Sequence, residues 1–332
     1  MGCGWAGARH ALAFRAAAAQ LLWAVDVDPA RASKIGAAHA TSDLVAALAD
    51  PSLDAVSVCL PHALHAEAAI AAADAGKHVL VEKPMATTVE EADRMIAAAN
   101  RARVLLMVAE TVRFDPLVER TLQLVREGAI GTPALVQISR QAYLRTSFLT
   151  QRRWFLNSRT AAGGIMLSGG VHDFDILRML LGEPETVYAR RVRQRFVEMQ
   201  GDDTSVAVVT FPNDVVATLI ESFLMKTAVT ATGEEEHLVR VDGELGSLLV
   251  DGRRSTIRLF SEHPGYQSSS SAPPDQEIHV PSADPFEREA RHFLNCIQAG
   301  LEPITSGRLQ RRNLELVLAA YASMQSGVPV WV

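Results

Sequence analysis

The alternation of short apolar runs with helical segments along the first third of the chain limits the possible fold most strongly. The apolar runs are bounded by Gly or Pro, and segments with helical patterning separate them. This rhythm is typical of βαβ units, in which helices connect the strands of a parallel sheet. The sequence therefore predicts strands at 21–25, 55–60, 78–81 and 104–108, and helices at 8–19, 29–39, 42–48, 63–75 and 89–102.

The rhythm changes after about residue 116. Long alternating runs follow, and strands without helices between them pair antiparallel, so we expect one open sheet. The expected strands are 134–143, 186–197, 204–211, 215–224, 237–241, 247–250 and 256–260; the expected helices are 117–127, 173–181, 285–299 and 308–325, and 268–274 is expected to be a flexible loop.

The predicted fold class is therefore α/β, in two domains. Residues 1–116 are expected to form a Rossmann domain that binds NAD(P). Residues 117–332 are expected to form an α+β domain with a large, mainly antiparallel open sheet, whose last helix is free to pack back on the first domain.

Composition excludes several classes of protein. With 48% hydrophobic and 21% charged residues the chain is not disordered, and its net charge of −6 argues against nucleic acid or an anionic membrane as a partner. The three cysteines lie far apart in the sequence, which excludes a disulfide framework and a thiolate zinc site. No transmembrane run or targeting segment is recognised. The expected location is the cytoplasm.

A glycine-rich loop opens the chain and runs directly into a predicted helix. Its G-x-G-x-x-G spacing is typical of dinucleotide binding, because the glycines make a tight turn, admit a pyrophosphate and let the helix pack closely. Asp26 follows about twenty residues later, where a carboxylate binds ribose hydroxyls and repels a 2′-phosphate. NAD is therefore favoured, and Arg31 and Lys34 leave NADP as an alternative. The loop residues are Gly2, Cys3, Gly4, Trp5, Ala6 and Gly7.

Only Met1 precedes this loop, whereas a loop of this kind normally follows a strand. That strand is central in a sheet of order 3-2-1-4, and about three or four buried apolar side chains would each contribute roughly 1.5–3 kcal/mol to stability. We therefore expect the first strand to be missing and the natural start to lie upstream of Met1.

Two polar stretches follow predicted strands. His62 and His65 have the spacing of a metal pair, but no carboxylate or cysteine completes a ligand set, so no metal site is predicted. A neutral His65 bonded to cofactor or backbone is preferred. Lys83 stands at the end of the strand 78–81, where a buried lysine of lowered pKa would polarise a hydroxyl or ketone oxygen; a surface lysine is the alternative.

A third polar stretch places His172 after two glycines at the start of a predicted helix. The glycines indicate a close approach of the backbone to a ligand. Histidine is the usual acid/base near neutral pH, so His172 is a candidate for proton transfer, and a hydrogen-bonded core histidine is the alternative.

Six stretches together are similar to motifs of one family. They are GCGWAGARHA (2–11), PHALHAEAAIAAADAGKHVLVEKPMA (61–86), RFDP (113–116), GGVHDFD (169–175), DGELGS (242–247) and GVPV (327–330). Over essentially its whole length the chain resembles the Gfo/Idh/MocA oxidoreductases, which include glucose–fructose oxidoreductase and inositol dehydrogenase. The resemblance implies a Rossmann domain, a C-terminal sheet used in oligomer contact, and NAD(P) as cofactor.

The resemblance also implies roles for individual residues. Lys83 would be the catalytic lysine and His172 the general acid/base. The cofactor would be lined by Gly2, Cys3, Gly4, Trp5, Ala6, Gly7, Asp26, Leu60, Pro61, His65, Glu82 and Lys83, and the substrate by Arg113, Trp154, Ser168 and Asp175. One position departs from the family, since Ser168 stands where many relatives carry Asp.

The expected function is hydride transfer between a nicotinamide and a hydroxyl or keto carbon of a sugar, cyclitol or related polyol. Two alternatives remain open at this point. One is an NAD-dependent glycoside hydrolase of the same fold, and the other is a non-catalytic NAD(P)-binding sensor. A homodimer or homotetramer formed through the C-terminal sheet is expected, with no nucleic acid or membrane partner.

Overall fold

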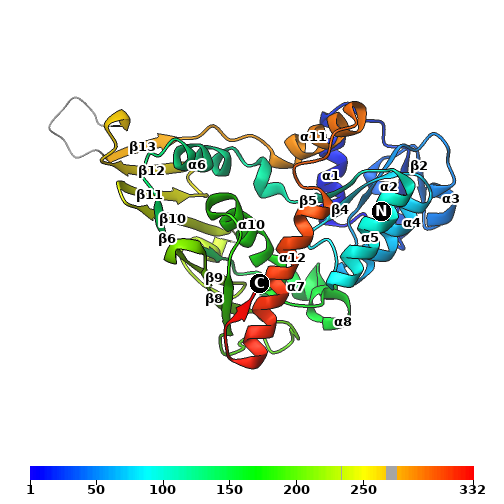
Figure 1. Ribbon diagram of the computed structural model, residues 1–332. Coiled ribbons are helices and arrows are strands. Elements are labelled where there is room, and N and C mark those ends of the chain that lie inside the picture. The colour runs from blue at the N-terminus through cyan, green and yellow to red at the C-terminus, as the bar shows by residue number, and fades with distance from the viewer. Residues whose placement is uncertain (233, 267–274) are drawn as a thin grey trace. The chain divides into compact units, whose positions relative to one another are not determined.

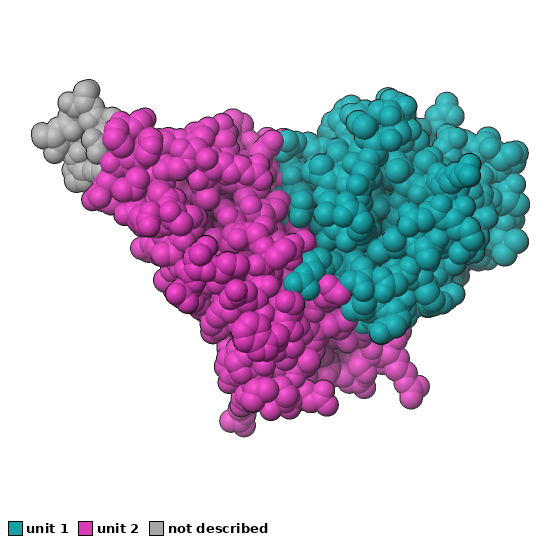
Figure 2. Space-filling model, in the orientation of Figure 1, with its two compact units in different colours: residues 1–114, 284–314 teal, residues 115–283, 315–332 magenta. Residues whose placement is uncertain are grey.

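The computed structural model describes residues 1–232, 234–266 and 275–332, so the loop expected at 268–274 lies outside the described residues. The chain divides into two compact units, which Figure 2 colours separately. Unit 1 comprises Met1–Phe114 and Asp284–Leu314, and unit 2 comprises Asp115–Ala283 and Glu315–Val332. Residues 284–314 therefore belong to unit 1, although they lie far along the chain.

Unit 1 consists of short parallel strands and the helices that connect them (Figure 1). Strands β3, β4 and β5 form one sheet in that order, and β1 pairs with β2 in another; all these pairings are parallel. This arrangement confirms the expected Rossmann domain. The strands are β1 Trp23–Val25, β2 His39–Thr41, β3 Ala55–Val58, β4 His78–Glu82 and β5 Leu106–Ala109, and the helices α1 Trp5–Ala16, α2 Pro29–Ile35, α3 Leu44–Leu48, α4 His65–Asp74, α5 Val89–Ala102 and α11 Pro285–Ala299, with 3-10 turns η1 His62–Leu64 and η2 Thr111–Phe114.

The end of the second predicted helix was wrong. Helix α2 begins at Pro29, where the Asp28 carboxylate accepts the Ala30 N–H, and it ends at Gly36, whose φ of 71° is the left-handed conformation of a helix cap. The following residues pair with β1 as strand β2 instead of extending the helix to residue 39.

Between β1 and β3 the described part of the chain contains no strand. Met1 and Gly2 occupy the end of that position: the Gly2 N–H donates to Val25 of β1, and the Cys59 N–H, just after β3, donates to Met1. A cavity of about 420 Å³ adjoins them, lined by α1, β1, β3 and α11, with Phe14 and Phe293 among its apolar walls. The place of the central strand is therefore open, as the sequence predicted.

Unit 2 contains a nine-stranded sheet of order β13-β12-β11-β10-β6-β9-β8-β7-β14. The pairing of β6 with β9 is parallel and the others are antiparallel, so the sheet is mainly antiparallel, as expected. The strands are β6 Pro133–Gln141, β7 Thr186–Arg191, β8 Thr204–Thr210, β9 Val216–Ser222, β10 Glu236–Gly243, β11 Gly246–Asp251, β12 Thr256–Ser261, β13 Asp275–His279 and β14 Val330–Trp331.

Helices α6 and α10 cover one face of this sheet (Figure 1), and α9 packs against β8 and β9. Inward residues alternate along the strands, as Ala217 and Leu219 do in β9, while Ile220 points outward and is 40% exposed. The helices are α6 Pro116–Arg126, α7 Arg145–Thr150, α8 Ser158–Ala161, α9 Ile165–Ser168, α10 Gly170–Leu181 and α12 Gly307–Ser326, the last of which begins in unit 1.

The predicted strand 186–197 is too long. Strand β7 stops at Arg191, because the chain then turns to bury Phe196 beside Phe148, Phe155 and Phe223. Short helices α7 to α9 and edge strands β13 and β14 were not predicted. In the described residues no helix is long and apolar enough to cross a membrane.

Candidate functional site

The glycine-rich loop has the geometry of a dinucleotide cradle. Gly2 has a φ of 79°, and a Cβ there would lie 2.2 Å from the Cys59 carbonyl oxygen. A Cβ at Gly7 would lie 2.0 Å from the Gly2 carbonyl oxygen, so both positions exclude any side chain. A Cβ at Gly4, in contrast, would meet no atom within 4 Å. The space over Gly4 is therefore available to a ligand.

Helix α1 begins at this loop and presents its N-terminus there. Its first turn contains no acidic residue, and no side chain caps it at Gly4. The unsatisfied backbone N–H groups and the helix dipole favour an anion at this end, such as a pyrophosphate. Trp5 and Ala6 form the first turn, and the indole of Trp5 is 60% exposed. The residues present therefore fit a dinucleotide.

Asp26 follows β1 and ties the loop to the sheet. Its Oδ2 accepts the Cys3 N–H at 2.7 Å, and its Oδ1 accepts the Asp28 N–H at 2.8 Å. The carboxylate is nearly buried, at 9% exposure. Each oxygen retains a further lone pair for a ribose hydroxyl, so Asp26 can shape the loop and also contact a ligand.

Lys83 and Glu82 stand at the carboxyl end of β4, where open parallel sheets bind ligands. The Lys83 N–H donates to Glu82 Oε2 at 3.1 Å, while Glu82 Oε1 lies 3.1 Å from Nε2 of His10. His10 projects from α1, and its Nδ1 lies 2.8 Å from the Ser57 hydroxyl of β3. His10 thereby links α1 to β3 and to Glu82, the residue before Lys83.

The pKa shifts of His10 and Glu82 both favour a charged pair. Burial opposes a charge on His10, but the neighbouring Cys59 and Glu82 side chains outweigh it and raise the pKa of His10 well above its usual range. Burial alone would raise the pKa of Glu82, yet its bond to His10 lowers that pKa. The sequence did not predict the role of His10, because nothing in the residues around it indicates that it pairs with Glu82, which lies far along the chain.

A second buried acid lies near this pair. Glu289 of α11 is 1% exposed, and its Oε1 has no hydrogen-bond partner among the described residues. Burial raises the pKa of Glu289 well above its usual range; the charge of His10 lowers it, and Glu82 and Glu110 raise it further. Its surroundings therefore favour the neutral, protonated form of Glu289.

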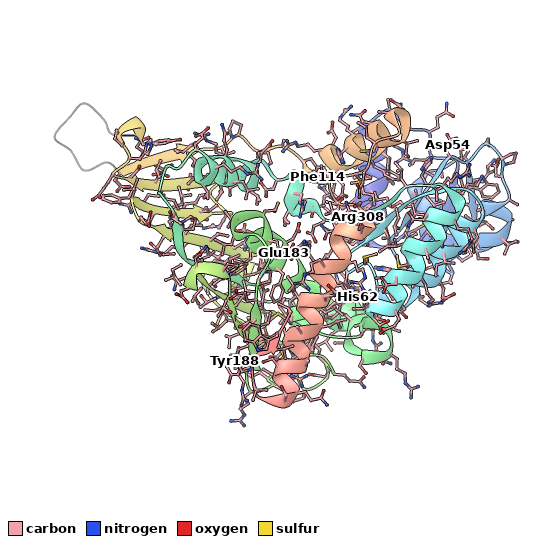
Figure 3. All side chains as sticks on the ribbon, in the orientation of Figure 1. Asp54, His62, Phe114, Glu183, Tyr188 and Arg308 are labelled. Carbon is pink, nitrogen blue, oxygen red and sulfur yellow. The ribbon has the colours of Figure 1, made fainter. Side chains whose placement is uncertain are left out.

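Leu60, Pro61 and His65 lie beyond the end of β3. The His65 ring is completely buried and lies between two backbone carbonyls, with Nδ1 2.8 Å from Pro84 O and Nε2 2.7 Å from Leu60 O. His62, labelled in Figure 3, is also buried, and its ring centre lies 5.8 Å from that of His65. The described residues contain no cluster of three side chains that would hold a metal ion.

In unit 2, helix α10 carries His172 in its first turn and Asp173 next to it. Arg140 of β6 donates to both oxygens of Asp173, from Nη2 at 2.7 Å and from Nε at 3.0 Å. Nε2 of His237, on β10, lies 3.1 Å from Asp173 Oδ1. Burial alone would raise the pKa of Asp173, but Arg140 and His237 lower it well below its usual range.

Glu221 of β9 is the second acid of this buried group. It is fully buried, and its carboxyl group shares a hydrogen bond with that of Asp173. Burial and the charge of Asp173 raise the pKa of Glu221 well above its usual range, which favours its protonated form. A Cβ at Gly169 would lie 2.8 Å from Glu221 Oε2. The glycine before α10 is therefore explained by the close packing of its backbone against this acid.

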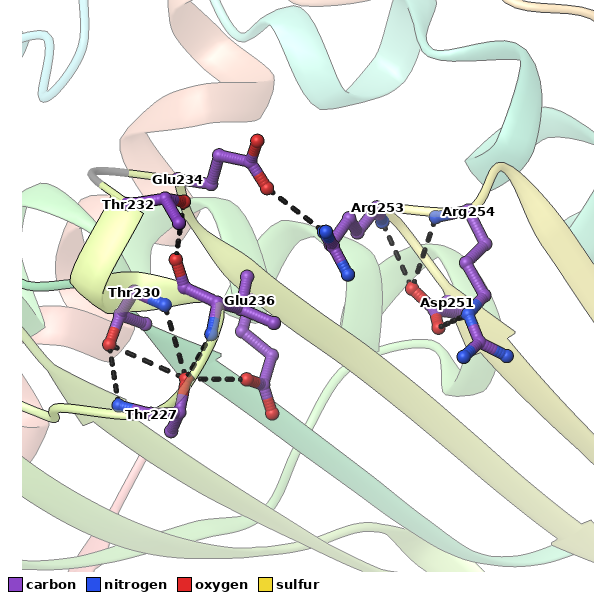
Figure 4. Close-up of polar contacts among 9 residues, drawn as sticks. Thr227, Thr230, Thr232, Glu234, Glu236, Asp251, Arg253 and Arg254 are labelled. Carbon is purple, nitrogen blue, oxygen red and sulfur yellow. Dashed lines mark hydrogen bonds and ion pairs between the residues drawn. The ribbon is translucent and has the colours of Figure 1, made fainter.

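Glu235 lies at the edge of the group, with its side chain 47% exposed, and Arg140 Nη1 also donates to its carboxylate. Burial opposes a charge on Glu235, but Arg140, His237 and, more weakly, His172 lower its pKa. Figure 4 shows how its neighbours are held: Arg253 donates to Glu234 at 2.9 Å, and the Thr227 hydroxyl donates to Glu236 at 3.0 Å. We call Arg140, Asp173, Glu221, Glu235 and His237 the arginine cluster.

The expected substrate residues fall in both units. Arg113 lies in η2 of unit 1 and donates to the Ile304 carbonyl at 3.3 Å. In unit 2, Trp154 is partly buried against the aromatic cluster around Phe148, with its ring centre 5.3 Å from that of Phe155. Ser168 ends α9, and Asp175 is completely buried on α10.

The chain matches two family models. A model described as an oxidoreductase family with an NAD-binding Rossmann fold matches residues 1–110, and the GFO/IDH/MocA C-terminal domain matches residues 118–249. The uncharacterised oxidoreductase YrbE of Bacillus subtilis (strain 168) is 30% identical over 303 residues, which cover 88% of this chain and 82% of that protein.

Two further relatives carry specific names. The myo-inositol 2-dehydrogenase of Thermotoga maritima is 29% identical over 303 residues, 88% of this chain and 84% of that protein. A levoglucosan dehydrogenase, solved in complex with NADH and levoglucosan, superposes with a TM-score of 0.89 at 22% identity, covering 100% of this chain and 97% of that one. The latter likeness establishes a shared fold.

Proposed function

Because the chain belongs to the GFO/IDH/MocA family of NAD-binding oxidoreductases, we propose that it transfers a hydride between the nicotinamide and a hydroxyl or keto carbon of a sugar, cyclitol or related polyol. The observation that carries this proposal is the open cradle over Gly4 in the same unit as Lys83, which directly follows β4. A relative named for myo-inositol and a structural neighbour holding levoglucosan support the class of substrate.

In the proposed site the cofactor is held by the loop and by the ends of the parallel strands. The N-terminus of α1 would hold the pyrophosphate, and Asp26 would accept from the ribose hydroxyls. When bound, the nicotinamide supplies or takes up the hydride. The residues assigned to the cofactor are Gly2, Cys3, Gly4, Trp5, Ala6, Gly7, Asp26, Leu60, Pro61, His65, Glu82 and Lys83.

Side chains of the protein stabilise charge, transfer the proton and bind the substrate. The Lys83 ammonium stabilises negative charge on the substrate oxygen as it develops, and the His172 imidazole takes the hydroxyl proton in oxidation or returns it in reduction. Arg113, Trp154, Ser168 and Asp175 are assigned to substrate binding. A carboxylate at Ser168 would stabilise charge on the imidazole, whereas the serine offers a neutral hydrogen bond.

The test is a substrate panel with the purified protein. We expect NADH absorbance to rise with NAD⁺ and at least one of myo-inositol, levoglucosan, D-xylose and D-glucose, and NADP⁺ to support a lower rate. Incubation with glycosides tests the hydrolase alternative. Release of the sugar product without net formation of NADH would show that the protein is a hydrolase and not a dehydrogenase. NAD⁺ binding with no turnover in either arm would favour the sensor.

The protein is further proposed to act in the cytoplasm as a homodimer or homotetramer. Cys3, Cys59 and Cys296 are free thiols, which supports a reducing compartment. The face of the large sheet opposite α10 exposes Val208, Ile220, Leu249 and Phe260, each between 37% and 40%, which supports contact with a second copy through this sheet.

A further inference from the structure

The ring of His65 makes two contacts that a neutral histidine cannot satisfy together. Its Nδ1 lies 2.8 Å from Pro84 O and its Nε2 lies 2.7 Å from Leu60 O. Both partners are backbone carbonyls, which only accept hydrogen bonds. A neutral imidazole carries one N–H, so its other nitrogen would direct a lone pair at a carbonyl oxygen. Both contacts are hydrogen bonds only when the ring carries two protons.

The two carbonyls belong to the two strand ends that the proposed function uses. Leu60 follows β3, next to the cofactor loop, and Pro84 directly follows Lys83 at the end of β4. His65 itself is the first residue of α4 and is completely buried. One ring therefore links the strand end assigned to the cofactor with the strand end that carries the catalytic lysine.

We propose that His65 is a protonation-dependent clamp: as an imidazolium it holds the Leu60 and Lys83–Pro84 strand ends together, and on losing a proton it releases one of them. The clamp makes His65 a positioning residue for Lys83. This kinetic role rests on the proposed function, whereas the protonation of the ring does not.

Charged groups of both signs act on the protonation of His65. Glu82 favours the imidazolium, and Lys83 on the same strand disfavours it. His62 on η1 packs edge-on against the ring, and the N-terminus of α4 disfavours a cation. From α5, Arg94 pairs with Glu67 of α4 at the surface. Burial outweighs the two carbonyls, which favour the imidazolium, and lowers the pKa of His65 below its usual range, so the clamp is complete on the acidic side and opens as the pH rises.

Nuclear magnetic resonance of the full chain, with ¹⁵N-labelled histidine, tests the protonation directly. We expect the ring nitrogens of His65 to show the imidazolium pattern near pH 5 and a single neutral tautomer near pH 8.5. The signal is assigned by its loss in His65→Asn, with His39→Asn as a matched control at an exposed histidine. A neutral pattern that persists throughout this range overturns the proposal.

A pair of variants separates the two arms of the clamp. The amide nitrogen of Asn replaces Nδ1 and retains the bond to Pro84, whereas that of Gln replaces Nε2 and retains the bond to Leu60. We expect His65→Gln to lower kcat about 3- to 10-fold, more than it weakens NAD⁺ affinity, and His65→Asn to weaken NAD⁺ affinity by a similar factor, more than it lowers kcat.

Both variants should also lose the dependence of kcat and NAD⁺ affinity on the protonation of residue 65. An equal loss of both quantities in both variants would show a merely structural role and overturn the clamp. If no substrate is turned over, the proposed function fails, but the ring pattern and the NAD⁺ titration still decide the proposal for His65.

Discussion

At the scale of single residues, the chemistry of this protein depends on which buried groups keep a charge. Lys83 is half-buried at a strand end, whereas Asp173 and Glu221 are completely buried in the arginine cluster. The cluster holds two adjacent acids with opposite behaviour, because Arg140 stabilises the charge on Asp173 and that charge keeps the proton on Glu221. Substitutions of Lys83 and of the two acids test these assignments.

Replacing Lys83 by Met removes the ammonium that stabilises charge on the substrate oxygen. We expect kcat to fall by roughly 10²- to 10³-fold, while the NAD⁺ dissociation constant changes little, since the backbone of the loop and Asp26 are unaltered. Steady-state kinetics and isothermal titration measure the two quantities. An unchanged kcat would remove Lys83 from the mechanism.

The arginine cluster predicts opposite outcomes for its two acids. Asp173→Asn leaves the buried Arg140 without its bidentate partner and should lower the free energy of unfolding by about 3–5 kcal/mol. Glu221→Gln resembles the protonated acid and should change it by less than about 1 kcal/mol at neutral pH. Urea unfolding compares them, and equal losses would contradict the assigned protonation states.

At the scale of elements, packing brings together groups that the chain order separates. Helix α11 packs on α1 in unit 1, where Arg9 donates to Asp284 at 3.0 Å at its start and Glu289 is buried beside His10 further along. In the same unit the open position between β1 and β3 leaves a cavity next to Met1. Both features predict changes in stability.

Glu289 should make the protein less stable as the pH rises. Its folded pKa is raised, so the native state binds the proton more tightly, and the stabilisation is complete below the unfolded value of about 4.5 and is lost toward the folded pKa. The amide in Glu289→Gln has no such proton to lose. The urea midpoint of this variant, minus that of the unaltered chain, should therefore increase between about pH 5 and pH 8. The exposed Glu90→Gln is the control and should show no such growth.

An added strand should fill the cavity. A five-residue extension Val-Ile-Val-Ala-Ile ahead of Met1 could hydrogen-bond to the facing edges of β1 and β3 and bury its side chains. We expect the melting temperature to rise by at least about 5 °C relative to a Gly-Ser extension of equal length. Equal melting temperatures for the two extensions would show that the cavity does not accept a strand.

At the scale of the whole molecule, the large sheet has one face covered by helices and one face with exposed apolar side chains. If the latter joins copies of the chain, light scattering after gel filtration should give a dimer or tetramer. Ile220→Glu places a charge at the centre of this face and should shift the population to monomer. A monomer before substitution would refute the proposed assembly.

The sequence determined the features that depend on neighbouring residues. The glycine spacing, the acid after β1 and the lysine at the end of β4 were all recognised, because turn geometry and strand ends are local. The two-unit α/β architecture and the open place of the first strand also followed from periodicity and chain order. Helix ends were less well predicted, since β2 forms only by pairing with β1.

The tertiary structure alone decided the polar partnerships behind the site. His10 meets Glu82 across 72 positions, and Arg140 meets Asp173 across 33 positions and His237 across 97. No spacing rule covers such pairs, because burial and the path of distant strands, rather than adjacent residues, bring them together. Burial in the folded molecule also decides their charges, and so it determined which acids are protonated and which hold a positive partner.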